Sequence, residues 1–479
     1  MLNIEKISGA ILPNTAQYRS LDWILSKDID INSCMKDMSI LQRYVLAVFF
    51  DSTNGQRWIK NSGWMGNENE CTSWHGILCD DNMDVIGISL DANAVGGTLP
   101  RELTELHAIR TISLYNNIIG GSIPSGVNKL RNLEVVDLEK NKLTGTVDFR
   151  DFISSSKSGS LKSLRLSFNQ FYGTISRSVG SLESLEDLWI AGNSFTGTVP
   201  KEMGALHDLE TLFMYKNLLT GEFLDSLTSL ASLEVLDASF NTFRDTIPES
   251  IGNLKYIKDI ILQSAGINGS IPAEIGQLRE LRKLVVPGND ISGQIPEEMN
   301  GLHQMTFLQM NDNQITGFIP ELDLPVLLSL DLSNNRIGGT IHSSVFHLQS
   351  LRYLYLENNL IRGTIPFDFG RSLSLEDIYL RDNLLTGTIP DVVRPGVLSS
   401  ISELLLNRNN LHGPVPDGIC NLRSTTFGSL VNLWADCETN TEGHINNVCA
   451  SGCCTFCTAG KNGQKHFLRR RKHVARNVL

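Results

Sequence analysis

The sequence predicts an α/β solenoid, a right-handed superhelix with a parallel β-sheet on its concave face and a cap at each end. The first observation is a motif, L-x-x-L-x-L-x-x-N-x-L-x-G-x-I-P, that occurs fourteen times, with one clean copy at residues 351–366. The second is its spacing, since the register residue recurs every 24 residues with three exceptions of 28, 22 and 26. The third is that all nine cysteines lie outside the array. A fixed period of this kind is typical of stacked repeats that bury their apolar faces on their neighbours.

Each part of the motif has an expected structural role, and the period with its leucine pattern is that of a leucine-rich repeat. The L-x-L segment predicts one short strand, and strands stacked about 4.8 Å apart join the leucines into one core. The register Asn carries a carbonyl and an amide, so we expect it to hydrogen-bond the backbone of its own turn and of the next repeat. The register residues are Asn93, Asn117, Asn141, Asn169, Asn193, Asn217, Asn241, Ala265, Asn289, Asn313, Asn335, Asn359, Asn383 and Asn409.

Departures from the motif predict local irregularities. Ala265 replaces the register Asn and predicts a local loss of order without a break in the array. The Gly before Ile-Pro predicts a tight turn, and the Pro ends a second short strand. Ser176, Leu224 and His342 replace this Pro.

The G-x-I-P half of the repeat resembles the plant-specific class of leucine-rich repeats found in plant receptor ectodomains and cell-wall inhibitor proteins. The resemblance covers about residues 85–416. It implies a twisted superhelix with a second sheet on one side.

Residues 1–84 are expected to form the N-terminal cap. Residues 16–26 and 39–51 predict helices, the second with an apolar face (Ile40, Leu41, Tyr44, Val45 and Val48) that should cover the first repeat. Ser39 is the expected N-cap of that helix. The Trp58, Trp64 and Cys71–Cys79 segment resembles the amino-terminal cap of plant-type repeats, which implies a Cys71–Cys79 disulfide with the tryptophan packed beneath it.

Residues 417–460 are expected to form a Cys-rich C-terminal cap that begins with a fifteenth strand near Leu430. The motifs Gln17-Tyr18, Leu41-Gln-Arg-Tyr44 and Ala-Asp-Cys437 with Cys-Cys-Thr-x-Cys457 together resemble large leucine-rich-repeat families of diatoms and related algae. Those proteins usually carry an N-terminal membrane anchor. This sequence lacks one, so we expect a secreted or intracellular relative, or a misplaced start codon.

Cysteines in the caps favour structural disulfides and an oxidising compartment. The six C-terminal cysteines (Cys420, Cys437, Cys449, Cys453, Cys454 and Cys457) allow 15 connectivities, which the sequence leaves open. Cys34 is left free or pairs between chains. The alternatives are a zinc site formed by Cys449, Cys453, Cys454 and Cys457, or a redox pair at Cys454 and Cys457.

The charge pattern argues against nucleic acid as the main partner. The formal charge is −11, and residues 461–479 carry seven Lys/Arg and no acid, so the remainder has 34 − 52 = −18. The basic run Arg469–Lys472 is interpreted as a solvated tail, a nuclear signal or a contact for acidic surfaces. No stretch approaches the ~18 apolar residues of a membrane span, and residues 1–20 lack signal-peptide features. A membrane would be reached only through an anchor absent from this chain.

No enzyme motif is convincing. Asp368-Phe-Gly370 spells a kinase metal motif, but it falls in the back half of a repeat and no other kinase motif accompanies it. The ten histidines are scattered. We expect no catalytic residues, no metal site and no cofactor.

The concave face is the expected contact surface, because the x positions of L-x-x-L-x-L-x-x-N point toward it. Two aromatic clusters and an apolar stripe between them are expected to be exposed there. Such residues are typical of interface hot spots, although strand propensity alone also favours them. The candidate ligand-binding residues are Trp189, Phe213 and Tyr215 in one cluster, Ile261, Val285 and Phe307 in the stripe, and Tyr353, Tyr355, Tyr379 and Arg381 in the other.

The sequence therefore predicts a non-catalytic recognition module, extracellular or on the cell surface, that binds a protein, peptide or glycan. The alternative is an intracellular scaffold or regulator, favoured by a single glycosylation sequon at Asn268 and by the missing signal peptide. A minor alternative is metal-thiol chemistry, or ice binding along a Thr column that starts at Thr98 and ends at Thr388 and is interrupted at Glu222, Gln294 and Phe318.

Overall fold

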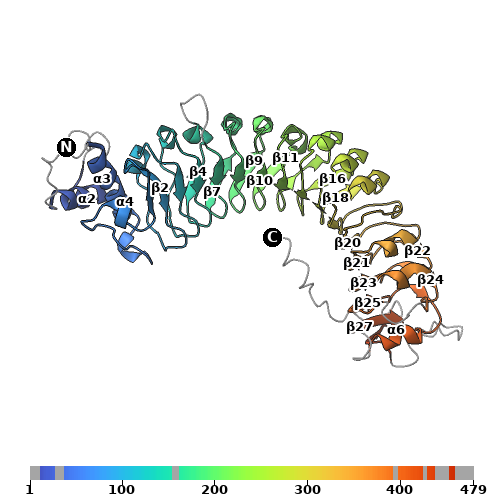
Figure 1. Cartoon of the computed structure of the whole chain (residues 1–479). Helices are drawn as coiled ribbons and strands as arrows, with labels where there is room; N and C mark the ends of the chain where they lie inside the picture. The colour runs from blue at the N-terminus through green and yellow to red at the C-terminus, as the bar shows by residue number, and fades with distance from the viewer. Residues whose placement is uncertain are drawn as a thin grey trace. The chain divides into compact units, whose positions relative to one another are not determined.

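The structure is a computed structural model that describes residues 11–26, 37–153, 161–391, 398–423, 429–436 and 453–458, without the side chains of 37–39 and 456–458. The chain divides into two compact units, Met1–Met305 and Thr306–Leu479, and each is a stack of repeats (Figure 1). The predicted α/β solenoid is confirmed. Within the described ranges, no helix has the length and apolarity needed to cross a membrane.

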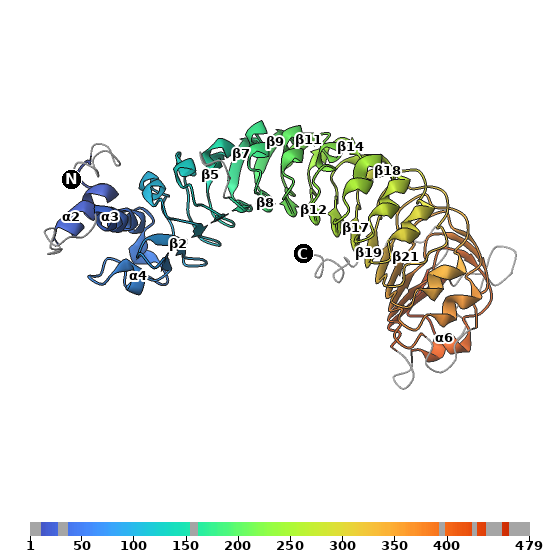
Figure 2. The same ribbon diagram turned by 45° about the horizontal axis from the view of Figure 1, so that its top comes forward.

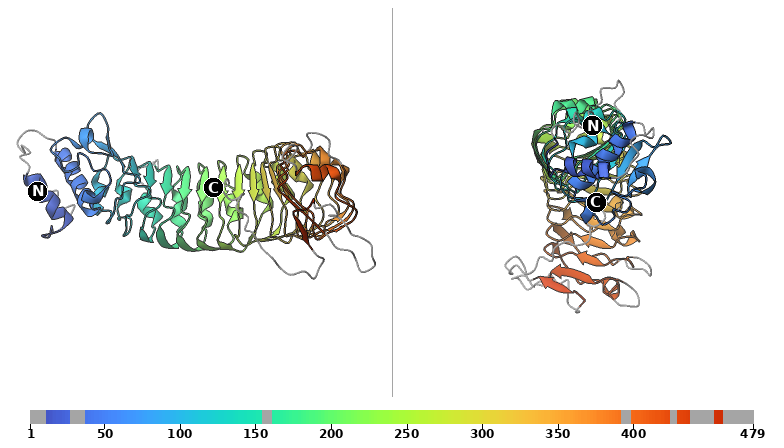
Figure 3. Two further views of the ribbon diagram at one scale, coloured as in Figure 1. Left: turned by 90° about the horizontal axis from the view of Figure 1, so that it is seen from below. Right: turned by 90° about the vertical axis from the view of Figure 1, so that its left-hand side faces the viewer.

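One short parallel strand per repeat builds the main sheet of the first unit, whose strands lie side by side in Figure 3. In the strands of the repeats, the central residue is buried and pairs in register with that of the next repeat, as Leu212 does with Leu236. The cap strand β1 pairs antiparallel with β2. The strands are β1 (Ile77–Cys79), β2 (Val85–Ser89), β3 (Thr111–Ser113), β4 (Val135–Asp137), β6 (Ser163–Arg165), β8 (Asp187–Trp189), β10 (Thr211–Phe213), β12 (Val235–Asp237), β15 (Asp259–Ile261) and β17 (Lys283–Val285).

The second unit repeats this arrangement. Its main strands also pair in parallel from one repeat to the next. They are β19 (Phe307–Gln309), β20 (Ser329–Asp331), β21 (Tyr353–Tyr355), β23 (Asp377–Tyr379), β25 (Glu403–Leu405), β27 (Asn432–Asp436) and β28 (Phe456–Thr458).

The segments that follow the register residue and lead into the G-x-I positions form further parallel strands on a different side of the repeats (Figure 2). They make separate sheets of five, three and three strands among the described residues. The first two sheets belong to the first unit: β5 (Thr144–Thr146), β7 (Gln170–Thr174), β9 (Ser194–Thr198), β11 (Leu218–Gly221) and β13 (Thr242–Phe243), then β14 (Asp245–Thr246), β16 (Ile267–Ser270) and β18 (Asp290–Ser292). The third belongs to the second unit: β22 (Arg362–Gly363), β24 (Leu384–Gly387) and β26 (Asn410–Leu411).

The back of most repeats is a short helical turn that begins just after the Ile-Pro position, whereas the repeat that follows Pro320 has none. Pro200, for example, has φ −70° and ψ 137° and precedes the turn η6 (Lys201–Ala205). The preceding Gly197 has φ +77°, and a Cβ there would lie 3.0 Å from Thr174, so the tight turn requires glycine. The turns are η2 (Arg101–Glu105), η3 (Val127–Lys129), η4 (Phe149–Phe152), η5 (Arg177–Ser181), η6, α5 (Leu224–Leu227), η7 (Glu249–Asn253), η8 (Ala273–Gln277), η9 (Glu297–Gly301), η10 (Ser343–His347), η11 (Phe367–Arg371) and α6 (Asp417–Asn421).

The register Asn side chains join successive repeats. The Nδ2 of Asn359 donates to the carbonyls of Leu356, 3.1 Å away in its own turn, and of Leu332, 2.9 Å away in the preceding repeat. Its Oδ1 accepts from the amide of Ile337 at 3.0 Å. The prediction that this side chain bonds to the following repeat is therefore wrong, because it bonds to the preceding one. The side chain reaches back because the backbone groups left open by the preceding turn lie on that side.

Ala265 causes less disorder than predicted. The amide of Phe243, which would otherwise donate to a register Asn, donates to the backbone carbonyl of Ala265 at 3.0 Å. The amides of Ala265, Gly266 and Ile267 all donate to Asn289 Oδ1 at 2.9–3.0 Å. The backbone thus replaces the missing side chain. In the repeat just before Ala265, the five-stranded sheet ends at β13 and the first three-stranded sheet begins at β14.

The N-terminal helices are α2 (Ala16–Ser26) and α3 (Asp37–Ser52). Because α3 begins at Asp37, Ser39 lies inside its first turn and is not the N-cap. The expectation of one apolar face is also wrong, because every residue from Tyr44 to Phe50 is buried. The helix contacts α2 and η2, so it is covered on more than one side.

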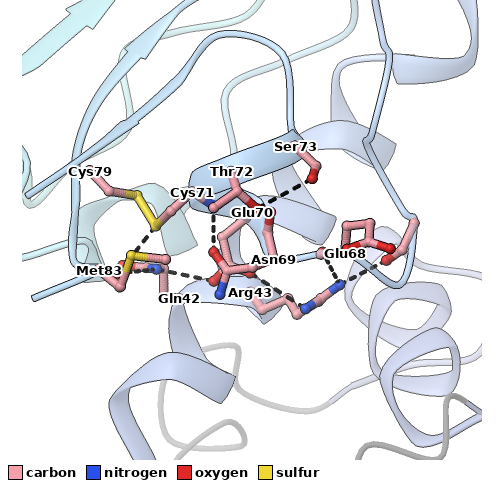
Figure 4. Close-up of polar contacts among 11 residues, drawn as sticks. Gln42, Arg43, Glu68, Asn69, Glu70, Cys71, Thr72, Ser73, Cys79 and Met83 are labelled. Carbon is pink, nitrogen blue, oxygen red and sulfur yellow. Dashed lines mark hydrogen bonds and ion pairs between the residues drawn. A yellow bond between two sulfur atoms is a disulfide. The ribbon is translucent and has the colours of Figure 1, made fainter.

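A polar network holds the rest of this cap together (Figure 4). Glu70 opens the short helix α4 (Glu70–Ser73) and is only 3% exposed. Its Oε1 accepts from Gln42 at 3.1 Å, and its Oε2 lies 3.5 Å from the Arg43 guanidinium. A disulfide joins Cys71 in α4 to Cys79 in β1. The cap is therefore cross-linked where α3 meets the first strands.

The C-terminal cap is held by a second disulfide, between Cys420 on α6 and Cys453. Cys454 is also disulfide-bonded. Two sulfurs of the alternative zinc set are therefore occupied. The structure does not describe the remaining cysteines of the sequence predictions, which are Cys34, Cys437, Cys449 and the side chain of Cys457.

Candidate functional site

The outward face of the main sheet places residues from successive repeats in columns. The middle residue is buried and its two neighbours are half-buried in β3, β4, β8, β10, β15, β19 and β23. This alternation follows from the two-residue period of a strand. We call the surface formed by the flanking residues the main-sheet face. Each unit has its own.

Three predicted residues meet on this face in the first unit, and we call them the first-unit aromatic cluster. Trp189 and Phe213 lie opposite each other in β8 and β10, with ring centroids 5.0 Å apart. The Tyr215 ring lies 6.2 Å from Phe213, edge to face. All three are half-buried rather than exposed, because each ring covers part of the next.

A charged pair borders the cluster, and the sequence reasoning did not single it out. The Arg165 guanidinium lies 4.1 Å from the Trp189 ring centroid and donates to Asp187 at 2.8 Å. Arg165 Nε and Trp189 Nε1 are both buried and have no hydrogen-bond acceptor within the described ranges. Such donors are rare in folded proteins and costly to leave unpaired. Aligning the strands by register would have found Arg165, because it occupies the Trp189 column one repeat earlier.

Carboxyl groups around the cluster are held in a poorly solvated environment. Burial raises the pKa of Asp137, Glu139 and Asp237 above the ordinary range of a carboxyl. Burial, reinforced by the charge of Asp237, also raises the pKa of the Tyr215 hydroxyl. Lys216 lies 5.6 Å from the Tyr215 ring centroid. The surface therefore offers aromatic area, unpaired donors and desolvated acids close together.

The apolar stripe differs from the expectation. Ile261 is half-buried, and Val285, which lies opposite it in β17, is only 3% exposed. The exposure predicted for Val285 is wrong, because a short side chain in this column is covered by its neighbours. Phe307 belongs to the second unit and is half-buried there. The stripe adds little accessible apolar area to the cluster.

The second-unit tyrosine cluster consists of Tyr353, Tyr355, Tyr379 and Arg381. The Tyr355 ring centroid lies 6.4 Å from that of Tyr353 and 4.7 Å from that of Tyr379. Enclosed by these two rings, Tyr355 is only 7% exposed, so the exposure predicted for it is also wrong. Arg381 is half-buried, and its Nε has no acceptor among the described residues.

Each tyrosine of this cluster donates to a carboxylate of the following repeat. The Tyr353 hydroxyl donates to Glu376 at 3.0 Å and the Tyr355 hydroxyl to Asp377 at 3.2 Å. Tyr379 donates to Glu403. Burial is the main cause of the raised pKa of Tyr355 and Tyr379, and the neighbouring acids add to it. The sequence reasoning missed these acids, although the strand register places Asp377 and Glu403 beside the tyrosines.

The remaining candidate motifs lie elsewhere. Asp368 of Asp-Phe-Gly sits in the helical turn η11 and pairs with Arg371 at 2.9 Å, while Phe369 is buried. No group of three or more metal-ligating side chains occurs in the described ranges. Asn268 is exposed on β16. The Thr column is exposed, but it runs along sheets that are separate pieces.

Family models for leucine-rich repeats match three parts of the chain. One matches residues 325–385, and another matches 160–182 and 232–254. No curated protein sequence gives a significant match.

Solved structures share the fold. The chain is similar to the plant peptide hormone receptor RGFR1 in complex with RGF2, with 30% identity and a TM-score of 0.66 over 73% of this chain and 56% of that one. The ectodomain of the Arabidopsis receptor kinase HAESA, in complex with an extended IDA peptide hormone, is 28% identical. Its TM-score is 0.66, and the match covers 77% of this chain and 62% of that one. A leucine-rich-repeat protein of Leptospira interrogans is 26% identical with a TM-score of 0.52, and the match covers 71% of this chain and 75% of that one. The chain spans less than two thirds of either plant protein.

Proposed function

Since the chain folds as a leucine-rich-repeat solenoid, we propose that it is a non-catalytic recognition module that binds a peptide or protein segment on its main-sheet face. The observation that carries this proposal is the first-unit aromatic cluster with its two unpaired donors, Trp189 Nε1 and Arg165 Nε. Trp, Tyr and Arg are the residues that dominate binding energy at protein interfaces.

The unpaired donors indicate what the ligand must offer. A buried donor without an acceptor costs about 1–3 kcal/mol, which a peptide carbonyl or carboxylate placed over Trp189 and Arg165 would recover. The desolvated acids Asp137, Glu139 and Asp237 favour a cationic group nearby, because an opposite charge stabilises their ionised form. A peptide segment supplies both kinds of group, which a neutral glycan does not.

The solved plant receptors support a peptide ligand. One is described as a peptide hormone receptor and the other is in complex with a peptide hormone, and both share the repeat fold with this chain. The C-terminal cysteine pattern and the N-terminal motifs further suggest a relationship with the receptor-like families of diatoms and algae.

The test uses a displayed random-peptide library selected on the purified chain. Selected peptides are then measured against the triple variant Trp189→Ala, Phe213→Ala and Tyr215→Ala. A matched control, Phe318→Ala with Phe367→Ala, removes two exposed aromatic rings that lie outside the main-sheet strands. The proposal expects at least tenfold weaker binding by the triple variant and unchanged binding by the control. Equal binding by the triple variant would place the ligand elsewhere.

An extracellular location is the second part of the proposal, supported by disulfides in both caps. The intact mass of native protein, alkylated with and without prior reduction, tests it. Six to eight cysteines protected until reduction support an extracellular module. Nine freely alkylated cysteines favour an intracellular scaffold instead.

A further inference from the structure

We propose that Asn268 carries an N-linked glycan, which covers the second sheet formed by β14, β16 and β18. The chain contains one Asn-x-Ser/Thr acceptor sequence, Asn268-Gly-Ser270. The proposal rests on the extracellular location proposed above, because N-linked glycans are attached along the secretory route, where disulfides also form. It goes beyond that location by assigning a covalent modification and the face of the first unit that the modification occupies.

The structure presents both acceptor side chains to solvent. Along β16, Ile267 is buried, whereas Asn268 and Ser270 are exposed. Because side chains two positions apart in a strand point to the same side, the amide and the hydroxyl share one surface. Neither side chain forms a hydrogen bond with any residue that the structure describes. The acceptor amide is therefore accessible and chemically unoccupied.

The neighbouring strands leave room for a sugar above this amide. Asn268 lies opposite Thr246 in β14 and Asp290 in β18, and both of these short side chains are exposed. Gly269, the middle residue of the acceptor sequence, has φ +75°, and a Cβ there would lie 3.0 Å from Thr246. The tight turn therefore requires glycine at the middle position, where only proline prevents glycosylation.

The repeat pattern accounts for Ser270 but not for Asn268. Ser or Thr follows the motif glycine in most repeats, as at Thr198. The position before that glycine holds Asn in this repeat alone, and the other repeats have Thr, Gly, Arg, Ser, Tyr or His there. By contrast, the register residue Asn289 is buried and donates to the carbonyl of Leu262 at 2.7 Å. Asn268 thus has no structural bond to lose when its amide is modified.

Glycosylation joins the Nδ2 of Asn268 to the anomeric carbon of the first sugar of a lipid-diphosphate-linked oligosaccharide. As the new C–N bond forms, the bond between that carbon and the phosphate oxygen breaks, and the lipid diphosphate leaves. Nδ2 loses one proton to a base of the transferase, and no electrons are gained or lost. The donor and the transferase belong to the secretory machinery, so the chain itself supplies only the acceptor.

The glycan determines which face of the first unit stays accessible. An N-linked glycan is bulky and hydrated, so it restricts access to the sheet on which it stands. β16 is the middle strand of its three-stranded sheet, between β14 and β18. The main strands β15 and β17 lie on a different side of the repeats (Figure 2). The glycan therefore blocks the second sheet around β16 against partners and against ice, and it leaves the main-sheet face open to a peptide.

Mass spectrometry of the native protein tests the modification. Trypsin cuts after Lys258 and Arg279, so the fragment 259–279 contains the acceptor sequence. We expect this fragment to carry a hexosamine-containing glycan and to lose it on enzymatic deglycosylation. In the full chain expressed through a secretory route, Asn268→Gln and Ser270→Ala should each lose the glycan.

Two further variants control for the substitutions themselves. Ser270→Thr keeps the acceptor sequence and should keep the glycan. Ser292→Ala removes the serine that lies opposite Ser270 in β18, and it should keep the glycan as well. A glycan retained by Ser270→Ala would belong to another residue and would overturn the assignment.

Two readouts separate this proposal from the proposed function. Cysteines protected from alkylation together with an unmodified fragment 259–279 would overturn the glycan while the extracellular location stands. Freely alkylated cysteines with an unmodified fragment would overturn both. Library peptides should bind the glycosylated chain and the Asn268→Gln variant equally, because the glycan stands on the second sheet. Weaker binding by the glycosylated chain would refute that placement.

Discussion

Asp245 provides the sharpest test of how this solenoid accommodates a broken repeat. It replaces the Gly of its own repeat, and Leu224 replaces the Pro of the repeat before it. The Asp245 Oδ2 accepts from the amides of Phe223 at 2.7 Å and Leu224 at 2.8 Å. Its Oδ1 accepts from the amide of Thr246 at 2.7 Å. The two departures are therefore coupled: the amide that a Pro would lack is satisfied by a side chain that a Gly would lack.

The expected cost of Asp245→Ala follows from these bonds. Phe223 and Leu224 are 2% and 1% exposed, so their amides would be left buried and unpaired. Each such donor lowers the free energy of unfolding by about 1–3 kcal/mol. Because removal of a buried carboxylate recovers part of this, the net loss of unfolding free energy is about 3 kcal/mol. Asp245→Asn keeps one oxygen for both amides but places an NH₂ near the Thr246 amide. It should cost about half as much.

Equilibrium urea unfolding followed by circular dichroism measures both variants. Hydrogen exchange of residues 221–246 should locate the loss in α5, because repeat arrays do not always unfold in one step. Asp208→Ala serves as the control, because Asp208 is exposed. An Asp245→Ala variant within 0.5 kcal/mol of the parent, or an Asn variant as unstable as the Ala variant, would refute the reasoning.

Three further predictions concern the ladder, the face and the C-terminal cap. Asn359→Ala removes the four side-chain hydrogen bonds of one register residue and should lower the free energy of unfolding by about 2–4 kcal/mol, measured by urea titration. Burial raises the pKa of Asp237 in the folded protein above its ordinary value, so folding favours the protonated carboxyl. The contribution of Asp237 to the free energy of unfolding is therefore complete below the unfolded-state pKa and is lost as pH rises through the folded-state pKa. Asp237→Asn should flatten this decline in urea titrations begun near pH 3.5 and should raise stability at pH 7. Cys420→Ser with Cys453→Ser opens a 33-residue separation and should cost about 3–4 kcal/mol, visible as a lower Tm on which reductant has a smaller effect than on the parent, since the Cys71–Cys79 disulfide remains.

The repeat pattern predicted the fold because each structural role is tied to one position. The leucines of L-x-L are the buried strand centres, and the register Asn, as at Asn359, makes the bonds that its carbonyl and amide allow. The compensation at Ala265 was not predictable in the same way, because the backbone of a neighbouring repeat supplies the missing acceptor. The pairing of Asp245 with Leu224 depends likewise on two repeats meeting in space.

The candidate site was predicted less completely than the fold. The sequence located the aromatic columns, and register alignment correctly places Trp189 beside Phe213. Burial was misjudged at Val285 and Tyr355, because exposure depends on how far neighbouring side chains reach across the strands. The charged groups that complete each cluster, such as Arg165 and Glu403, lie in different repeats from the rings they contact. A reading of single repeats therefore overlooks them.

The central claim is that ligands bind the main-sheet face, and hydrogen exchange with a bound library peptide tests it most directly. The account predicts that protection increases in β8, β10 and β12, where the aromatic cluster lies, while β9 and β11 on the second sheet exchange as in the free chain. Protection confined to the second sheet or to the helical turns, with β8 and β10 unchanged, would contradict the account.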